Sequence, residues 1–245
     1  MLSVLYEDED LIVVEKPVGL ESQVSAGFRP DMVSEIKKHI NRLCPTGKEP
    51  YVGVIHRLDK PVGGVMVYAK TKEAAASLSK QVQSHTMHKM YHAVVCGKLV
   101  DNVGNYVDWL LKDGKTNTSK IVEKGITGAK CARLNYRVLK TLEMEPVTGG
   151  PVSFVEVELL TGRHHQIRVQ FAAHGTPLWG DNRYNPLFTQ DGLNRNHNAV
   201  PPVQDGAGGH HNIALFAGYL SFCHPKTGQE MVFTAKPKGD IFQIL

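Results

Sequence analysis

The chain lacks long apolar runs, clustered cysteines and a basic N-terminal leader. No run approaches the roughly 20 apolar residues that a helix needs to span a bilayer. The first residues do not combine positive charge with a long apolar stretch, as a secretory signal would. The four cysteines stand far apart and form no C-x-x-C pair, so reduced and mostly buried thiols are expected. These absences disfavour membrane and secreted proteins, and we expect a cytoplasmic one.

What is present is the composition of an ordinary globular protein. Apolar residues make up 42% and charged residues 21% of the 245 positions, and this length suits one large domain or two small ones. The net charge is +4 and the isoelectric point is near 8.8. This balance permits a nucleic-acid partner but does not identify one.

The most informative residues lie in a polar segment between two short apolar runs. The runs at 51–55 and 65–68 contain β-branched residues and predict strands. Between them, Pro61 and the glycine pair at 63–64 favour a turn. Asp59 therefore follows a strand end, where rigid elements can hold a side chain within reach of a substrate. Taken alone, such an aspartate is more often a turn-former whose carboxylate binds a nearby main-chain N–H.

Elsewhere the apolar patterns predict a mixture of short helices and strands. Asp31 and Thr71 are typical N-caps for helices expected over residues 31–43 and 72–84. The expected strands cover residues 3–6, 11–15, 89–97, 130–142, 153–160, 212–222 and 230–235. The remaining expected segments are a lysine-rich surface ribbon at 101–128, a short helix at 163–175 and a long loop at 185–211.

Several motifs resemble one known family. The segment His56-Arg57-Leu58-Asp59, with a turn, a glycine, an apolar strand and Ala69-Lys70-Thr71 after it, resembles the catalytic segment of the RluA family of pseudouridine synthases. Also similar to that family are Lys16-Pro17-x-Gly19, Lys89-x-Tyr91-x-Ala93-x-Val95-x-Gly97, Arg163-x-His165-Gln166-Ile167-Arg168 and Gly180-Asp181-x-x-Tyr184. The chain departs from the family at Pro61-Val62-Gly63-Gly64, at His164 in place of threonine and at Gln170 in place of histidine.

This resemblance implies a single pseudouridine synthase domain over residues 1–245. The implied fold is α+β, with a mixed, largely antiparallel central sheet, flanking helices and an active-site cleft. The chain starts without an S4-type RNA-binding module, so this domain itself is expected to hold the RNA. The implied reaction isomerises specific uridines of structured ribosomal or transfer RNA to pseudouridine, with the target base flipped out of its stack. It involves no redox change, so no cofactor is expected; the expected partner is RNA, and the protein is expected to be a monomer.

The resemblance also implies the roles of individual residues. Asp59 is the reacting carboxylate, Arg168 its guanidinium partner and Tyr91 the ring beside the uracil. Whether the carboxylate attacks C1′, removes the C2′ proton or adds to C6 stays open. Arg57, two residues before Asp59, is placed to hold the RNA as the base leaves. The further candidate RNA contacts are His56, Arg163, His165 and Gln166. On the helix expected at 163–175, His164 and His165 would share a face with Arg168.

Two other classes of function stay open. One is a non-catalytic RNA-binding protein on the same fold, although a binder has no need of Asp59, Tyr91 and Arg168 together. The other is a metal-dependent hydrolase, suggested by the twelve histidines. His88 and His92 have ligand-like spacing only on a helix, where a strand is expected, and no H-E-x-x-H motif occurs, so no metal site is expected. The sequence does not identify the RNA or the uridine.

Overall fold

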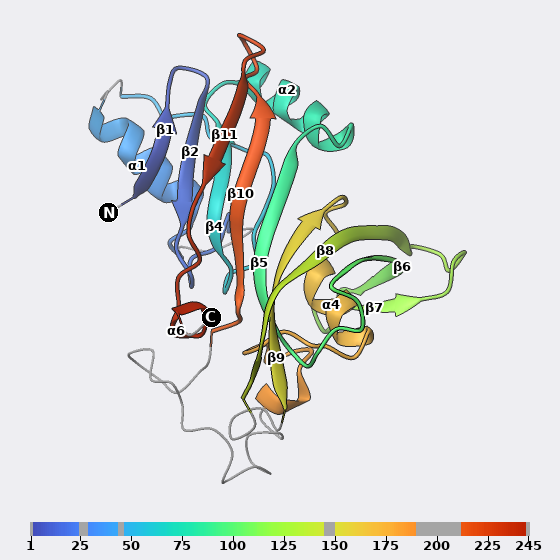
Figure 1. Ribbon diagram of the computed structural model, residues 1–245. Helices are drawn as coiled ribbons and strands as arrows, with labels where there is room; N and C mark the ends of the chain where they lie inside the picture. Colours follow the sequence, from blue (N-terminus) through green and yellow to red (C-terminus); the bar gives the residue numbers. More distant parts are fainter. Residues whose placement is uncertain (1, 25–28, 44–46, 145–149, 190–211, 244–245) are drawn as a thin grey trace. The chain divides into compact units, whose positions relative to one another are not determined.

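The computed structural model describes residues 2–24, 29–43, 47–144, 150–189 and 212–243. The helices are α1 (Met32–Leu43), α2 (Lys72–Gln83), α4 (Gln166–Ala173) and α6 (Asp240–Gln243), with the 3-10 turn η1 (Pro186–Phe188) (Figure 1). The strands are β1 (Ser3–Glu7), β2 (Leu11–Lys16), β3 (Gly53–Val54), β4 (Gly63–Ala69), β5 (His88–Cys96), β6 (Val103–Asp113), β7 (Thr118–Val122), β8 (Lys130–Glu143), β9 (Pro151–Leu159), β10 (Leu215–Cys223) and β11 (Glu230–Thr234). Over the described ranges, no helix has both the length and the apolar character needed to cross a membrane.

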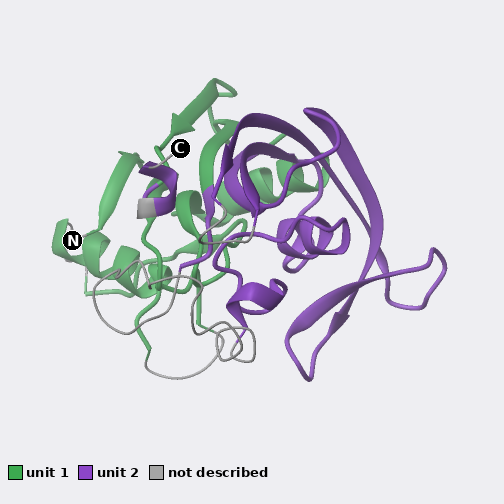
Figure 2. Ribbon diagram, turned by 60° about the horizontal axis from the view of Figure 1, so that its bottom comes forward, with its two compact units in different colours: residues 1–89, 217–237 green, residues 90–216, 238–245 purple. Residues whose placement is uncertain are grey.

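The chain divides into two compact units, and each unit combines distant parts of the sequence (Figure 2). The first unit comprises residues 1–89 and 217–237, and the second comprises residues 90–216 and 238–245. The expectation of a single domain over residues 1–245 stays a prediction.

The first unit is built around β4. Its strands follow the order β1-β2-β4-β10, with β3 pairing with β4 and β11 with β10. All seven residues of β4 are buried, and Val67 packs in a cluster with Leu11, Phe222 and Leu78 of α2. Burying each such aliphatic side chain contributes roughly 1.5–3 kcal/mol. This cluster makes β4 a rigid support for the loop that precedes it.

Gly64 lets β4 lie close to the neighbouring main chain. Its φ of +129° is in the region that side-chain-bearing residues avoid, and a Cβ there would run into the main chain of Ala217 on β10. A glycine is therefore required at this position, shortly after the turn at Pro61. The start of β4, just after the predicted turn, therefore packs closely against β10.

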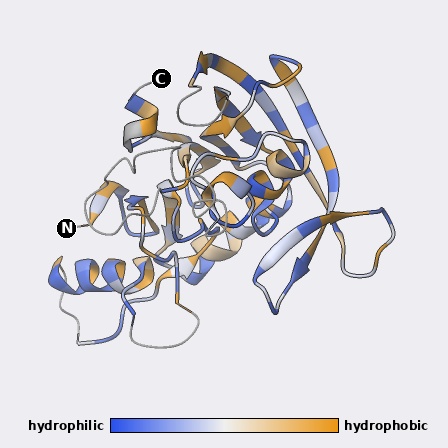
Figure 3. Ribbon diagram, turned by 90° about the horizontal axis from the view of Figure 1, so that it is seen from below, coloured by the Kyte–Doolittle hydropathy of each residue, from blue (hydrophilic) through white to orange (hydrophobic). Residues whose placement is uncertain are grey.

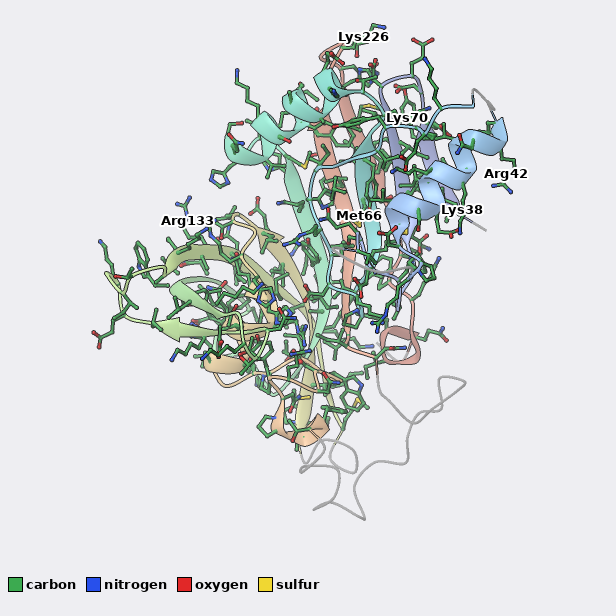
Figure 4. The ribbon with its side chains drawn as sticks, turned by 180° about the vertical axis from the view of Figure 1, so that it is seen from behind. Lys38, Arg42, Met66, Lys70, Arg133 and Lys226 are labelled. Carbon is green, nitrogen blue, oxygen red and sulfur yellow. The ribbon has the colours of Figure 1, made fainter. Side chains whose placement is uncertain are left out.

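Both predicted helix caps of the first unit are confirmed. The Asp31 carboxylate accepts the Ser34 N–H at 2.7 Å, and the Thr71 hydroxyl accepts the Ala74 N–H at 3.2 Å. Each cap stabilises its helix by about 1 kcal/mol. Lys38 and Arg42 both come from α1 (Figure 4), and the Lys38 side chain is 69% exposed and pairs with Glu35, as expected for a solvated face.

The second unit contains an antiparallel sheet with the strand order β5-β9-β8-β6-β7. Hydrophilic and hydrophobic residues alternate along several of its strands (Figure 3), as expected when one face of a sheet is covered. Val169 of α4 packs against Leu110 and Ala132 on that sheet. This contact fixes the apolar side of α4 against the sheet. A separate cluster in this unit contains Val94 and Trp179.

The predicted mixture of helices and strands is confirmed, with three corrections to individual elements. The strand expected at 51–55 is reduced to β3, which has two residues. The ribbon expected at 101–128 contains two regular strands, β6 and β7, paired as a hairpin. The helix expected from residue 163 begins only at Gln166. Much of the loop expected at 185–211 lies outside the described residues, and its described start contains η1.

Candidate active site

Asp59 lies between β3 and β4 on a turn that is held through its main chain. The Asp59 carbonyl accepts the Val62 N–H at 2.9 Å, which closes the turn. The preceding residue, Leu58, is held by the buried Ser22 hydroxyl, which donates to the Leu58 carbonyl at 2.8 Å and accepts the Leu58 N–H at 3.0 Å. The half-buried Asp59 side chain therefore projects from a backbone that is fixed on both sides.

Lys16 is a second support for this turn. It is fully buried. Its ammonium donates to three main-chain carbonyls, those of Pro17 at 2.9 Å, Leu20 at 2.5 Å and Lys60 at 3.2 Å. Burial lowers the pKa of Lys16 to about 8, and the negative charges of Asp59 and Glu21 oppose that shift. Lys16 thus places a positive charge near Asp59. Its bond to the Lys60 carbonyl also joins the turn to the end of β2.

His56 and Arg57 precede Asp59 on the same segment and have different environments. Burial, together with the nearby charge of Lys89, lowers the pKa of His56 to about 3, so its imidazole is neutral at physiological pH. Its Nε2 accepts the Val67 N–H at 3.3 Å, which leaves the ring proton on Nδ1. That Nδ1 is buried and has no hydrogen-bond partner among the described residues. Arg57 is exposed.

In the second unit, Tyr91 lies on β5 and Arg168 on α4. Tyr91 is 6% exposed and stands opposite Val157 of β9 in the strand register. The Tyr91 side chain therefore projects from a strand that is paired with β9, and not from a loop.

Arg168 forms a bidentate ion pair with Asp181. Its Nε donates to Oδ2 at 2.8 Å and its Nη2 to Oδ1 at 2.7 Å, and the two side chains are 4% and 0% exposed. The Tyr184 ring lies 5.3 Å from the guanidinium carbon, within cation–π range. Asp181 Oδ1 also accepts the N–H groups of Arg183 at 2.9 Å and Tyr184 at 3.3 Å. The guanidinium is thus oriented by a carboxylate that the following turn holds in place.

Gln166 and Arg163 hold the loop before α4 in place. The Gln166 Oε1 accepts the Thr161 hydroxyl at 2.8 Å and the Arg163 N–H at 3.0 Å, and its Nε2 donates to the Arg133 carbonyl at 3.0 Å. Gln166 is buried. The Arg163 Nε donates to the Cys131 carbonyl at 2.8 Å. These bonds fasten the start of α4 to β8.

The structure corrects the expected position of His164 and His165. They do not lie on a helix with Arg168, because His165 is the N-cap of α4 in the left-handed conformation, with φ 53° and ψ 27°. Their rings stack instead, with centroids 3.8 Å apart. His164 Nδ1 lies 2.9 Å from the Ser119 hydroxyl, and His165 Nδ1 lies 2.8 Å from the Tyr184 hydroxyl.

Sequence reasoning missed three residues that support these side chains: Lys16, Asp181 and Tyr184. All three lie in the stretches that carried the family resemblance, Lys16-Pro17-x-Gly19 and Gly180-Asp181-x-x-Tyr184. The resemblance of these two stretches to the family was the sequence signal that could have identified them.

One group of side chains in the described residues has metal-like spacing, Asp8, Asp10 and His224, whose ligand atoms lie within 4.8 Å of one another. Hydrogen bonds account for it. The His224 Nδ1 accepts the N–H groups of Lys226 and Thr227, each at 3.2 Å. The proton is therefore on Nε2, which donates to Asp8 Oδ2 at 2.8 Å. The group fastens the turn after β1 to the turn after β10.

The sequence and fold match known proteins over most of the chain. Residues 10–173 match the family model described as RNA pseudouridylate synthase. An uncharacterized RNA pseudouridine synthase of Aquifex aeolicus is 34% identical over 245 residues, covering 95% of this chain and 68% of the relative. Ribosomal large subunit pseudouridine synthase D of Zymomonas mobilis is 31% identical over 242 residues, covering 98% and 70%. The structure of human RNA pseudouridylate synthase domain containing 4 has a TM-score of 0.72 at 22% identity, covering 96% of this chain and 88% of that one.

These matches confirm the resemblance drawn from the motifs, and the solved structure confirms the α+β fold. The range that matches the family model includes Asp59, Tyr91 and Arg168. The chain belongs to the RNA pseudouridylate synthase family, isomerases that convert uridine to pseudouridine in RNA.

Proposed function

We propose that this chain forms pseudouridine at specific positions of ribosomal large subunit RNA or transfer RNA, with Asp59 as the reacting carboxylate. The observation that carries the proposal is the main-chain support around Asp59: Ser22 binds Leu58 on one side, and the Val62 N–H closes the turn on the other. A turn-forming aspartate needs no such support from a distant segment, whereas a group that must meet a sugar carbon in one geometry does.

The reaction breaks the C1′–N1 bond, turns the freed base and joins C1′ to C5; the C5 proton leaves and N1 gains a proton. Asp59 must be ionised for each of the open routes, whether it attacks C1′, removes the C2′ proton or adds to C6. A nearby cation favours the ionised form. We assign this part to Arg168. Its planar guanidinium carries several N–H donors and can bind a carboxylate through two of them at once.

We assign Tyr91 to the uracil ring. Its burial on β5 supports stacking against a flipped base, a contact worth roughly 1–3 kcal/mol. A phenol is a weak base at neutral pH, so removal of the C5 proton by Tyr91 requires an intermediate in which that proton is strongly acidic.

The remaining candidates divide into two groups. Arg57 is exposed and suits the space that the flipped base leaves, while Arg163, His165 and the buried Nδ1–H of His56 are proposed as donors toward sugar or phosphate oxygens. Gln166 is different, because the described hydrogen bonds occupy its amide within the protein. We propose that Gln166 acts by holding Arg163 and the start of α4.

The decisive experiment compares Asp59→Asn with the native chain on unmodified RNA, read by pseudouridine mapping and by RNA affinity. Asparagine keeps the size of the side chain but cannot serve as an ionised carboxylate. We expect pseudouridine formation to be lost, with the unfolding midpoint and RNA affinity nearly unchanged.

The matched control is Asp113→Asn, which alters the aspartate that ends β6 and accepts the Lys115 N–H in the β6–β7 turn. It is expected to keep full activity. Pseudouridine formed by Asp59→Asn at the native rate would overturn the assignment, while tight RNA binding by a native chain that forms no pseudouridine would favour a non-catalytic binder.

The choice of RNA follows the relatives' names. Several are named ribosomal large subunit pseudouridine synthase D and one tRNA pseudouridine synthase C. Separate assays on large-subunit RNA and on transfer RNA distinguish these substrates. We further propose a monomer acting in the cytoplasm, which light scattering of the purified chain and cell fractionation test.

A further inference from the structure

A closed circuit of contacts surrounds the start of α4 in the second unit. The Ser119 N–H donates to the Tyr184 hydroxyl at 2.8 Å, and the Ser119 hydroxyl lies 2.9 Å from His164 Nδ1. The His164 ring stacks on His165, and His165 Nδ1 lies 2.8 Å from the Tyr184 hydroxyl. Ser119 of β7, both histidines and Tyr184 therefore form one ring of four contacts.

The direction of the bond between Tyr184 and His165 follows from its neighbours. The Ser119 main-chain N–H can only donate, so the Tyr184 oxygen accepts it. The Tyr184 hydroxyl proton then requires an acceptor, and the one that the described contacts provide is His165 Nδ1. Burial raises the pKa of Tyr184, which keeps that proton on the hydroxyl at neutral pH.

We propose that Tyr184 is a positioning residue that fixes the tautomer of His165, with the ring proton on Nε2, and thereby orients the RNA contact proposed for His165 above. This inference rests on the proposed function for its RNA contact, and the tautomer stands independently of it. The buried N-cap position of His165 holds the ring in one place, and the choice of nitrogen decides what the ring can donate to.

Tyr184 also acts on Arg168. Its ring lies against the guanidinium, and its main-chain N–H binds the same Asp181 oxygen that Arg168 binds. The hydroxyl and the ring therefore serve different side chains, and two substitutions separate them. Tyr184→Phe removes only the hydroxyl, whereas Tyr184→Leu also removes the ring.

The first measurement is nitrogen NMR of the histidines in the full chain without RNA. The native chain is expected to show His165 protonated on Nε2 alone, and Tyr184→Phe is expected to show a mixture of tautomers. The matched control is Tyr106→Phe, because Tyr106 stacks on His174 with ring centroids 3.9 Å apart and lies outside the proposed machinery. It is expected to leave the His165 signals unchanged.

The second measurement separates KM from kcat for pseudouridine formation. With a hydrogen bond worth about 1 kcal/mol, Tyr184→Phe is expected to raise KM about fivefold with kcat nearly unchanged. Tyr184→Leu is expected to lower kcat as well, because the Arg168 guanidinium loses the aromatic ring that lies against it.

Protonation of His165 on Nδ1 in the native chain, or a Tyr184→Phe variant with the native tautomer, would overturn the proposal whatever the activity. If His165 has the expected tautomer but Asp59→Asn forms pseudouridine at the native rate, only the proposed function is overturned.

Discussion

The ion pair between Arg168 and Asp181 offers the sharpest test of how this fold holds its arginine. Asp181→Asn keeps the shape of the side chain and an oxygen for the N–H groups of Arg183 and Tyr184, but removes the charge. It also turns an amide NH2 toward the donors of Arg168, so that donor faces donor. Both side chains are almost fully buried, at 4% and 0% exposed, and solvent can replace little of what is lost.

The magnitude follows from that burial. Removing one member of a buried ion pair costs roughly 3–5 kcal/mol, because the other charge is left without compensation. In a chain of this length 1 kcal/mol corresponds to about 2–4 °C, so the thermal midpoint should fall by roughly 6–20 °C. Replacing both residues by apolar ones of similar size, Arg168→Met with Asp181→Leu, should recover part of the loss, since no charge is then stranded.

The assay is urea unfolding followed by circular dichroism, with Glu156→Gln as the matched control. Glu156 pairs with Arg137 at the same 2.7 Å, but the side chains are 20% and 61% exposed. A pair of this kind contributes under about 1 kcal/mol. Equal losses of stability in Asp181→Asn and Glu156→Gln would refute the reasoning, because burial would then not set the cost.

Two further predictions concern the support of the Asp59 turn. The pKa of Lys16 is lowered from 10.5 to about 8, so between these pH values the unfolded chain binds more protons and stability should rise with pH. Lys16→Met should remove that rise, a difference of roughly 3 kcal/mol over the whole window; parallel stability curves from urea unfolding at pH 7, 9 and 10 would contradict it. Gly64→Ala should cost about 2–4 kcal/mol, because the added Cβ meets the Ala217 main chain and the positive φ is strained. The control Gly114→Ala, where a Cβ would meet nothing within 4 Å, should stay within about 0.5 kcal/mol in the same assay.

The elements that the sequence predicted well are those determined by neighbouring residues. The strands β1 and β2 follow from two short apolar runs, and the caps at Asp31 and Thr71 bind N–H groups three residues ahead. Such contacts are local, so the chain encodes them without reference to the rest of the fold.

The errors have physical causes of the opposite kind. The early helix start at residue 163 was wrong because His165 adopts a positive φ, which non-glycine residues seldom do and no local pattern announces. The strands β6 and β7 were missed because only Leu110 and Ser119 among their residues are buried, so their sequences lack the regular alternation of apolar and polar residues that marks a half-buried strand.

The supporting residues could not be assigned for a related reason. A lysine beside Pro17 is ordinarily exposed, and the burial of Lys16 depends on the Lys60 carbonyl, 44 residues further along the chain. The motif containing Asp181 was visible in the sequence, but its partner became identifiable only when α4 and the turn after it were placed together. Pairing across the fold is a tertiary property, and single-sequence patterns do not specify it.

The electrostatics of the Asp59 segment also bear on the choice between an enzyme and a simple RNA-binding protein. A protein that only binds RNA gains affinity from cations near phosphates, and a carboxylate in the same place repels them. Here the carboxylate-bearing turn is fixed by Ser22 and by Lys16, and the burial of Lys16 carries a desolvation cost that its lowered pKa records. The negative charge of Asp59 partly offsets this cost, but a protein that only binds RNA has no use for a carboxylate fixed in this place. The arrangement is the one expected if the negative charge is needed at one position during bond breaking, where a fixed group stabilises the transition state more than the ground state.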